Sequence, residues 1–197
     1  FIVGLFIRLL IMPYTQYCGI WEKIAHMDEI FILGNPADPI LRDTAWGIAH
    51  YPFYMASYIP YLLLSYFGKN YEFLLFFLMK IPPLIGDIVV FYSLYNIALL
   101  LLKDRMKSIS VASAYFLNPL IIWMSSAMGH PEQLVAGFVL LSILNLLKGK
   151  TVRSAIYLSI ASFLRYLPFL FLPCFLAYLW RRDKSSRLVV KFFGVYL

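Results

Sequence analysis

The chain has 197 residues, of which 62% are hydrophobic, 18% aromatic and only 14% charged. Soluble domains usually carry about 25% charged residues, so this composition excludes an ordinary soluble protein and predicts a multi-pass membrane protein. The net charge of +7 does not indicate nucleic-acid binding, because the basic residues occur in short loops between apolar runs. We therefore expect an all-α, polytopic transmembrane helical bundle, with the lipid bilayer as a partner and no nucleic acid.

Apolar runs stand at both ends of the chain, at residues 1–12 and 188–197. No small-residue cleavage site follows the first run, so it does not have the form of a signal peptide. Because the sequence begins and stops inside apolar runs, we expect residues 1–197 to be one transmembrane core truncated at both ends.

Residues 13–49 form a net acidic segment between the first two apolar runs. The acidic character predicts the external face of the membrane, opposite the basic loops. Within it, apolar residues recur at helical spacing over 20–33, and Gly34-Asn35-Pro36 ends the pattern. We expect an amphipathic helix that lies along the membrane surface.

The next apolar segments are residues 51–67 and 71–102, and the second of these contains Lys80, Pro82, Pro83 and Asp87. A span needs roughly 20 residues, so the longer segment is either one tilted helix or a helix broken at the prolines. Residues 48–102 therefore contain one or three crossings, because both counts satisfy the loop charges.

Three short connections are basic: residues 103–107, 148–153 and 181–187. This pattern is typical of cytoplasmic loops, so residues 109–127 run outward and 132–147 run back. Residues 154–180 lie between two basic loops but are too short for two full crossings, which need about 40 residues. We predict a re-entrant helical hairpin over 154–180, with Arg165 at its tip.

A polar string at residues 118–133, which includes Ser125, Ser126, His130 and Glu132, interrupts the apolar sequence. Polar groups next to a bilayer core cost several kcal/mol unless they have partners or a function. This string is therefore the first candidate for a functional site, and it shares the external face with the acidic segment.

Four stretches in order resemble motifs of the GT-C superfamily of membrane glycosyltransferases. They are Gly34-Asn35-Pro36 with His50-Tyr51-Pro52-Phe53; Lys80-Ile81-Pro82-Pro83-Leu84-Ile85-Gly86-Asp87; Asn118-Pro119-Leu120 with Gly129-His130-Pro131-Glu132-Gln133; and Ala161-Ser162-Phe163-Leu164-Arg165-Tyr166-Leu167-Pro168. The nearest resemblance is to mannosyltransferases of the GPI-anchor and archaeal type, of which the chain resembles the N-terminal part.

The resemblance implies transfer of a sugar, with mannose favoured, from a polyprenyl-phosphate carrier to a lipid or glycan acceptor. The reaction would take place at the external or lumenal face of the plasma membrane or the endoplasmic reticulum membrane. No cofactor is expected, and no Asp-x-Asp cluster appears in the sequence, which favours a metal-independent reaction.

The candidate catalytic bases are Asp28, Glu22 and Glu29, because a positioned carboxylate contributes about 10²–10⁴-fold to such a transfer. The alternative is that they form the solvated face of the surface helix. The sequence departs from the GT-C pattern here, since residues 16–20 contain no Asp or Glu where the superfamily usually has its catalytic carboxylate.

The candidate residues for the donor phosphate and sugar are Arg165, His130, Glu132, Gln133 and Tyr166. A guanidinium inside an apolar hairpin suits a phosphate, although it can also reach the membrane interface. Glu132 can alternatively stabilise the start of the following helix. Lys80 and Asp87 fit structural pairing between helices better than a catalytic role.

Two other functions remain open. One is a membrane transporter or flippase-like protein in which Lys80, Asp87 and Arg165 line a substrate path, although the sequence contains no evident repeat. The other is a GT-C-like scaffold without catalytic activity, which the missing carboxylate favours.

Overall fold

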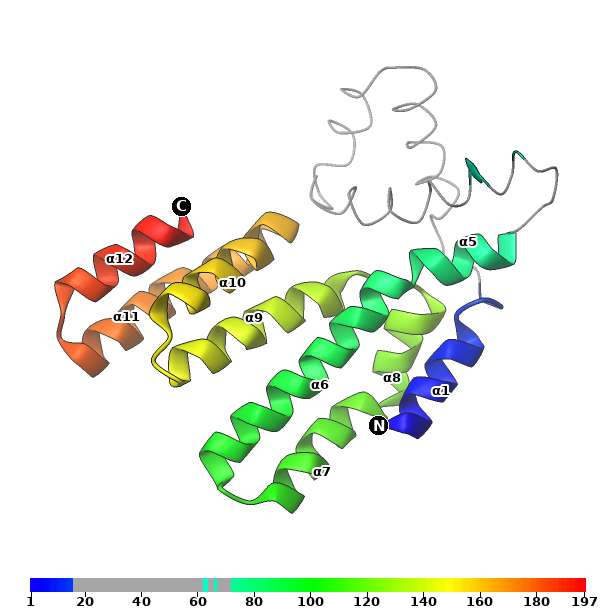
Figure 1. Cartoon of the computed structure of the whole chain (residues 1–197), viewed down its shortest axis with the longest axis horizontal. Helices are drawn as coiled ribbons and strands as arrows, with labels where there is room; N and C mark the ends of the chain where they lie inside the picture. Colours follow the sequence, from blue (N-terminus) through cyan, green and yellow to red (C-terminus); the bar gives the residue numbers. More distant parts are fainter. Residues whose placement is uncertain (16–61, 64–65, 67–71) are drawn as a thin grey trace.

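The computed structural model describes residues 1–15, 62–63, 66 and 72–197 (Figure 1). Every regular element in this part of the chain is helical, as predicted. The elements are α1 (Ile2–Ile11), α5 (Glu72–Met79), α6 (Ile81–Leu102), α7 (Arg105–Phe116), α8 (Pro119–Ile122), the π-helical η2 (Trp123–Ala127), α9 (Glu132–Leu147), α10 (Thr151–Leu164), the 3₁₀-helical η3 (Leu167–Phe171), α11 (Leu172–Asp183) and α12 (Ser186–Tyr196). The predicted surface helix, with Glu22, Asp28 and Glu29, lies outside the described residues.

The long apolar segment 71–102 is interrupted at Lys80, immediately before its two prolines. Pro82 and Pro83 lack the N–H groups that would continue the hydrogen-bond ladder of α5, but they fit the first turn of a helix. Helix α6 accordingly starts anew at Ile81, and its first backbone bond runs from Leu84 N to Lys80 O at 3.1 Å.

The end of α5 and the whole of α6 nevertheless form one candidate span, Phe76–Leu102, which in the described part of the chain is long and apolar enough to cross a membrane. A second segment is long and apolar enough to cross a membrane only if α7 and Pro119–Ala127 are counted together. These two pieces are bent by 49° at Asn118. The other apolar helices α1, α9 and α10 are shorter than a full span. The crossing count beyond this helix, and with it the re-entrant placement of 154–180, stays a prediction.

Helices α6 and α9 pack against each other at two glycines. A Cβ on Gly86 of α6 would lie 2.3 Å from the backbone nitrogen of Leu134, and a Cβ on Gly137 of α9 would lie 3.0 Å from Val89 Cγ1. Only glycine allows backbones to approach this closely. The contact fixes the beginning of α9 against α6.

A buried ion pair joins α1, α6 and α7. Arg8 and Asp87 are fully buried, and Arg8 Nε donates to Asp87 Oδ2 at 2.8 Å. The hydroxyl of Tyr115 donates to Asp87 Oδ1 at 2.8 Å, and Arg8 also donates to the carbonyl of Phe116 at 2.7 Å while lying over its ring. The carboxylate therefore has partners on both of its oxygens.

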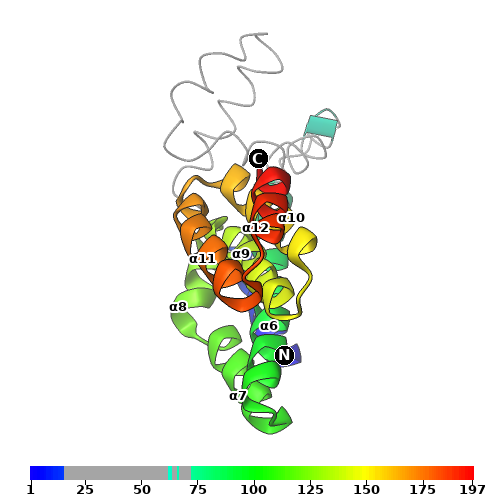
Figure 2. The same cartoon turned by 90° about the vertical axis from the view of Figure 1, so that its left-hand side faces the viewer.

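The C-terminal helices form a second packed unit with α9. Figure 2 shows α10, α11 and α12 at the end that faces the viewer, and both α10 and α11 contact α12. Their shared core contains Leu146, Ala155, Leu158, Leu172, Phe175, Leu179, Phe192 and Tyr196. A neighbouring cluster of Leu134, Val135, Val139, Ala161 and Leu164 packs α9 against α10.

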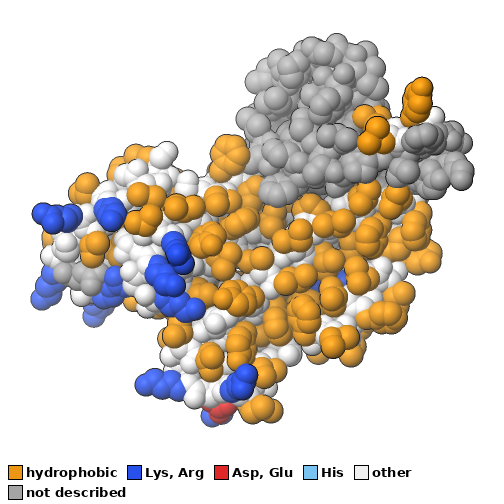
Figure 3. Space-filling view, in the orientation of Figure 1, with side chains coloured by type: hydrophobic (Ala, Val, Ile, Leu, Met, Phe, Trp, Pro, Cys, Tyr) orange, Lys and Arg blue, Asp and Glu red, His pale blue; other side chains and the backbone are white. Residues whose placement is uncertain are grey.

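The outer surface is apolar over much of the face in Figure 3, with basic side chains gathered toward the lower left. Exposed apolar residues include Leu101 of α6, Leu120 of α8 and Phe163 of α10. A large exposed apolar surface with charges at one end is what a helical protein in lipid presents.

Replacing Gly86 by alanine is expected to lower the free energy of unfolding by about 3 kcal/mol, because the methyl group would overlap the backbone of α9. The matched control is Gly194→Ala in α12, where no atom lies within 4 Å and the helix should gain about 0.5–1 kcal/mol. Thermal unfolding of the full chain in detergent measures both. A tolerated Gly86→Ala would contradict the close packing of α6 and α9.

Replacing Asp87 by alanine is expected to destabilise the protein by about 3–5 kcal/mol, because the substitution leaves the Arg8 guanidinium buried without its carboxylate. In contrast, Lys107→Ala removes an exposed pair with Asp104 and should change stability by less than about 1 kcal/mol. Unfolding midpoints in detergent compare the two variants. Similar midpoints would show that Arg8 finds another partner.

Candidate functional site

The polar string predicted as a functional site folds into a helix with a local change of winding. The side chain of Asn118 accepts a hydrogen bond from Leu120 N at 2.9 Å, and Pro119 occupies the first turn of α8. The chain then widens into the π-helix η2, where Met128 N donates to Trp123 O at 2.9 Å. Single π-helical turns inside helices are frequent at functional sites. The widened turn buries Ser125 and Ser126.

A glycine ends this turn and directs the chain into α9. Gly129 has a φ of 71°, in the left-handed region that favours glycine. The backbone N–H of His130 donates to Met124 O at 3.0 Å, and Pro131 precedes Glu132, the first residue of α9. His130 and Glu132 therefore lie at the start of α9, beside the contact of that helix with α6.

Arg165 reaches the same place from the end of α10. Helix α10 ends at Leu164, and Arg165 has extended backbone with φ −156° and ψ 141° before the 3₁₀ helix η3 begins at Leu167. Its guanidinium forms a hydrogen-bonded ion pair with the Glu132 carboxylate. The Nδ1 atom of His130 lies 3.4 Å from Glu132 Oε2. The structure thus brings Arg165, which follows Glu132 by 33 residues in the sequence, to two other predicted site residues, Glu132 and His130.

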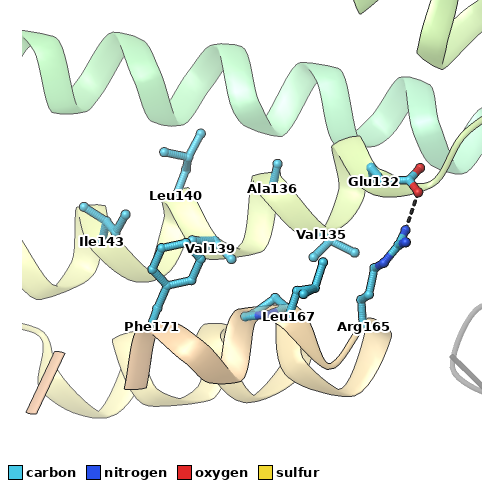
Figure 4. Close-up of a pocket in the computed structure, with 10 residues that line it drawn as sticks. Glu132, Val135, Ala136, Val139, Leu140, Ile143, Arg165, Leu167 and Phe171 are labelled. Atoms are coloured by element: carbon cyan, nitrogen blue, oxygen red, sulfur yellow. Dashed lines mark hydrogen bonds and ion pairs between the residues drawn. The ribbon is translucent and has the colours of Figure 1, made fainter. Parts of the chain in front are cut away.

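An apolar cavity of about 550 Å³ extends from this cluster along α9 (Figure 4). In Figure 4 the ion pair stands at one end, while side chains of α9 and η3 face each other along the rest. The lining residues are Glu132, Val135, Ala136, Val139, Leu140, Ile143, Arg165, Leu167, Pro168 and Phe171. The charged side chains among them, Glu132 and Arg165, occupy one end, so the cavity combines a polar mouth with an apolar interior.

The remaining candidates occupy different surroundings. Gln133 is buried, and its Oε1 has no hydrogen-bond partner among the described residues, whereas Tyr166 is largely exposed. Asp87 belongs to the ion pair with Arg8 described above. None of these three lines the cavity at the Glu132–Arg165 ion pair.

Lys80 is fully buried beneath the turn that carries His130. Its Nζ donates to Met12 O at 2.8 Å and to Thr15 Oγ1 at 2.7 Å, and it also bonds the carbonyl of Thr15. A Cβ on Gly129 would lie 3.1 Å from Lys80 Cγ. Lys80 therefore connects the end of α1, the start of α6 and the turn before α9.

Sequence reasoning did not identify Arg8 or the apolar residues that line the cavity. Arg8 is the one charged residue in the first apolar run, and a lone charge in such a segment is the signal that could have identified it. Among the described residues, no group of His, Cys, Asp and Glu side chains is arranged to hold a metal ion. Nothing comparable in the sequence marks Val139 or Phe171.

Comparison with known proteins identifies one matching family. Residues 47–197 match the family described as "GPI transamidase subunit PIG-U". No curated protein and no solved structure gives a significant match to the chain.

A comparison of Gly129→Ala with Gly149→Ala tests the support that Lys80 gives to the site. Both glycines have positive φ, so each substitution should cost about 1–2 kcal/mol of backbone strain. Gly129→Ala should cost about 1 kcal/mol more, because its methyl group would press on the Lys80 side chain, which its hydrogen bonds hold in place. A Cβ on Gly149 would have no atom within 4 Å. Unfolding midpoints in detergent provide the measurement. Equal losses would show that Lys80 is free to move.

Proposed function

The chain belongs to the PIG-U family of GPI transamidase subunits, and from this premise we propose that it holds the lipid part of a glycosylphosphatidylinositol (GPI) substrate for a transamidase complex of the endoplasmic reticulum membrane. In this role the chain positions a substrate and performs no bond-breaking step itself. A binding subunit of this kind needs an apolar site that opens beside a group able to meet a phosphate.

The observation that carries the proposal is the cavity along α9 with the Glu132–Arg165 ion pair at one end. Its volume of about 550 Å³ lies within the range of ligand pockets, about 300–1,000 Å³. Walls made by Val139, Ile143 and Phe171 suit a hydrocarbon chain, since each buried methylene contributes about 0.8 kcal/mol.

The polar end suits a phosphodiester attached to that hydrocarbon. A guanidinium has several N–H donors in a planar fork, so a phosphate can join Glu132 as an anionic partner of Arg165. Glu132 holds the guanidinium in place before a lipid arrives, which lowers the ordering cost of binding. The imidazole of His130 borders the same polar end, with its Nδ1 3.4 Å from Glu132 Oε2.

The second candidate is sugar transfer from a polyprenyl-phosphate donor, as the GT-C resemblance implies. The observation in its favour is that an imidazole, a carboxylate and a guanidinium meet at the mouth of the cavity. In this alternative Arg165, His130 and Glu132 bind the donor, while Asp28, Glu22 or Glu29 act as the base. A catalytically inactive scaffold that keeps the lipid cavity fits the first candidate.

Filling the cavity with Val139→Trp is expected to reduce GPI anchoring of a reporter by about tenfold, which corresponds to about two lost buried methylenes. The measurement is surface display of the reporter in cells whose only copy of this subunit is the variant. Val111→Trp, on the exposed side of α7, is the matched control and should leave display unchanged. Subunit abundance is measured alongside to detect misfolding.

A photoreactive GPI lipid gives a second readout that does not depend on the whole complex. Crosslinking to α9 should fall in Val139→Trp and in Arg165→Gln, and wild-type crosslinking in both would contradict the proposal. Membranes that hold the full-length protein are also assayed for transfer from radiolabelled polyprenyl-phosphate mannose and glucose. Transfer that is lost in Arg165→Ala would favour the second candidate instead.

A further inference from the structure

A second cavity, of about 350 Å³, lies at the other end of α9, away from the Glu132–Arg165 ion pair. It is bounded by the α9–α10 connection, the first turn of α10 and one side of α12. The lining residues are Gly149, Lys150, Thr151, Val152, Arg153, Leu188 and Lys191. Three of these are cations contributed by two separate parts of the chain.

The α9–α10 connection holds Lys150 and the start of α10 in a fixed position. Gly149 has a φ of 74°, its N–H donates to Leu146 O at 3.0 Å, and Lys150 N donates to Asn145 O at 2.8 Å. This pair of bonds is the Schellman arrangement that ends a helix with a glycine. Because the connection is this short, Gly149 and Lys150 border the cavity together with the first residues of α10.

The first turn of α10 adds hydrogen-bond donors. No side chain caps this helix, and its first intrahelical bond is Ser154 N to Lys150 O. The earlier N–H groups of the helix therefore lack intrahelical acceptors, as in every helix start, and they carry the positive end of the helix dipole. Thr151 is only 7% exposed, and its hydroxyl forms no hydrogen bond to another described residue.

The charge in the cavity is not balanced by acidic side chains. Lys150, Arg153 and Lys191 are exposed, and none of them forms an ion pair within the described part of the chain. Figure 3 shows basic side chains gathered at this end of the molecule. Several uncompensated cations beside open N–H groups favour an anion with several oxygens, such as a phosphate.

The surroundings favour a phosphate carried by a lipid. In Figure 1 the α9–α10 connection and the α6–α7 connection, which follows the candidate span Phe76–Leu102, both lie toward the lower left of the bundle. Helix α12 exposes Val190, Phe193 and Val195 beside Lys191. A cationic pocket next to an exposed apolar surface, at the end of a spanning helix, matches the headgroup and chain of an anionic phospholipid.

We propose that the cavity between the α9–α10 connection and α12 binds the phosphate headgroup of an anionic phospholipid in the membrane leaflet at the basic end of the bundle. Lys150, Arg153 and Lys191 contact the phosphate oxygens, and the first N–H groups of α10 complete the site. This site is separate from the apolar cavity along α9 and does not depend on the function proposed for that cavity.

The test uses the full-length protein in detergent, titrated with dioctanoyl phosphatidic acid while thermal unfolding is followed. Wild-type protein should be stabilised by this lipid and not by dioctanoyl phosphatidylcholine. The triple variant Lys150→Gln, Arg153→Gln, Lys191→Gln should bind at least about tenfold more weakly. The matched control is Lys103→Gln, Arg105→Gln, Lys107→Gln, which removes the same charge at the α6–α7 connection and should change affinity by less than about twofold.

A change that keeps every charge provides a second variant. Thr151→Val is close in shape and should weaken binding of phosphatidic acid by about threefold through loss of the hydroxyl donor. Titration with inorganic phosphate distinguishes the source of the anion. Binding at least about tenfold weaker than that of the lipid supports the headgroup, and equal affinity would assign the site to soluble phosphate and overturn the proposal.

Two further outcomes would also overturn it. Equal weakening in the two triple variants would mean that general surface charge, not the cavity, attracts the lipid. Equal stabilisation by phosphatidic acid and phosphatidylcholine would mean that no phosphate site exists.

Discussion

The close contact of α6 with α9 at Gly86 is the constraint on which the candidate site depends. The backbone of α6 lies against the first residues of α9, so the side chains at the start of α9 have a fixed position relative to the rest of the bundle. Glu132 is one residue before that contact. The side chain of Lys80 packs against the turn that contains Gly129, immediately before α9. Arg165 reaches Glu132 because α10 packs against this same positioned helix through Leu134, Val135 and Leu164.

Buried charge is used in the described part of the chain in two different ways. Arg8 and Asp87 are fully enclosed, and both carboxylate oxygens of Asp87 have protein partners, so their pairing fixes α1, α6 and α7 relative to one another. Arg165 and Glu132 are paired at the mouth of a cavity, where both side chains keep some exposure. An ion pair that borders empty apolar space can meet a ligand, whereas a sealed pair can only stabilise the fold.

The two cavities give the α9 helix a different chemistry at each end. At the start of α9 an apolar interior lies beside one ion pair, and this is the cavity for which we propose a lipid ligand. At its other end, cations and open N–H groups surround a smaller space that fits a phosphate headgroup.

The sequence by itself determined the all-helical class, the membrane character and three members of the site cluster. These features follow from local chemistry: apolar run length, proline and glycine positions, and the cost of polar groups in apolar segments. The sequence left open whether segment 71–102 is one helix or is broken at its prolines, and it did not predict the bend at Asn118 within the apolar run 109–127. Only the tertiary structure decided which charges pair and where space remains. Arg8 meets Asp87, and Glu132 meets Arg165, across long sequence separations. Val139 and Phe171 line a cavity because of how whole helices pack, and no local pattern encodes that packing.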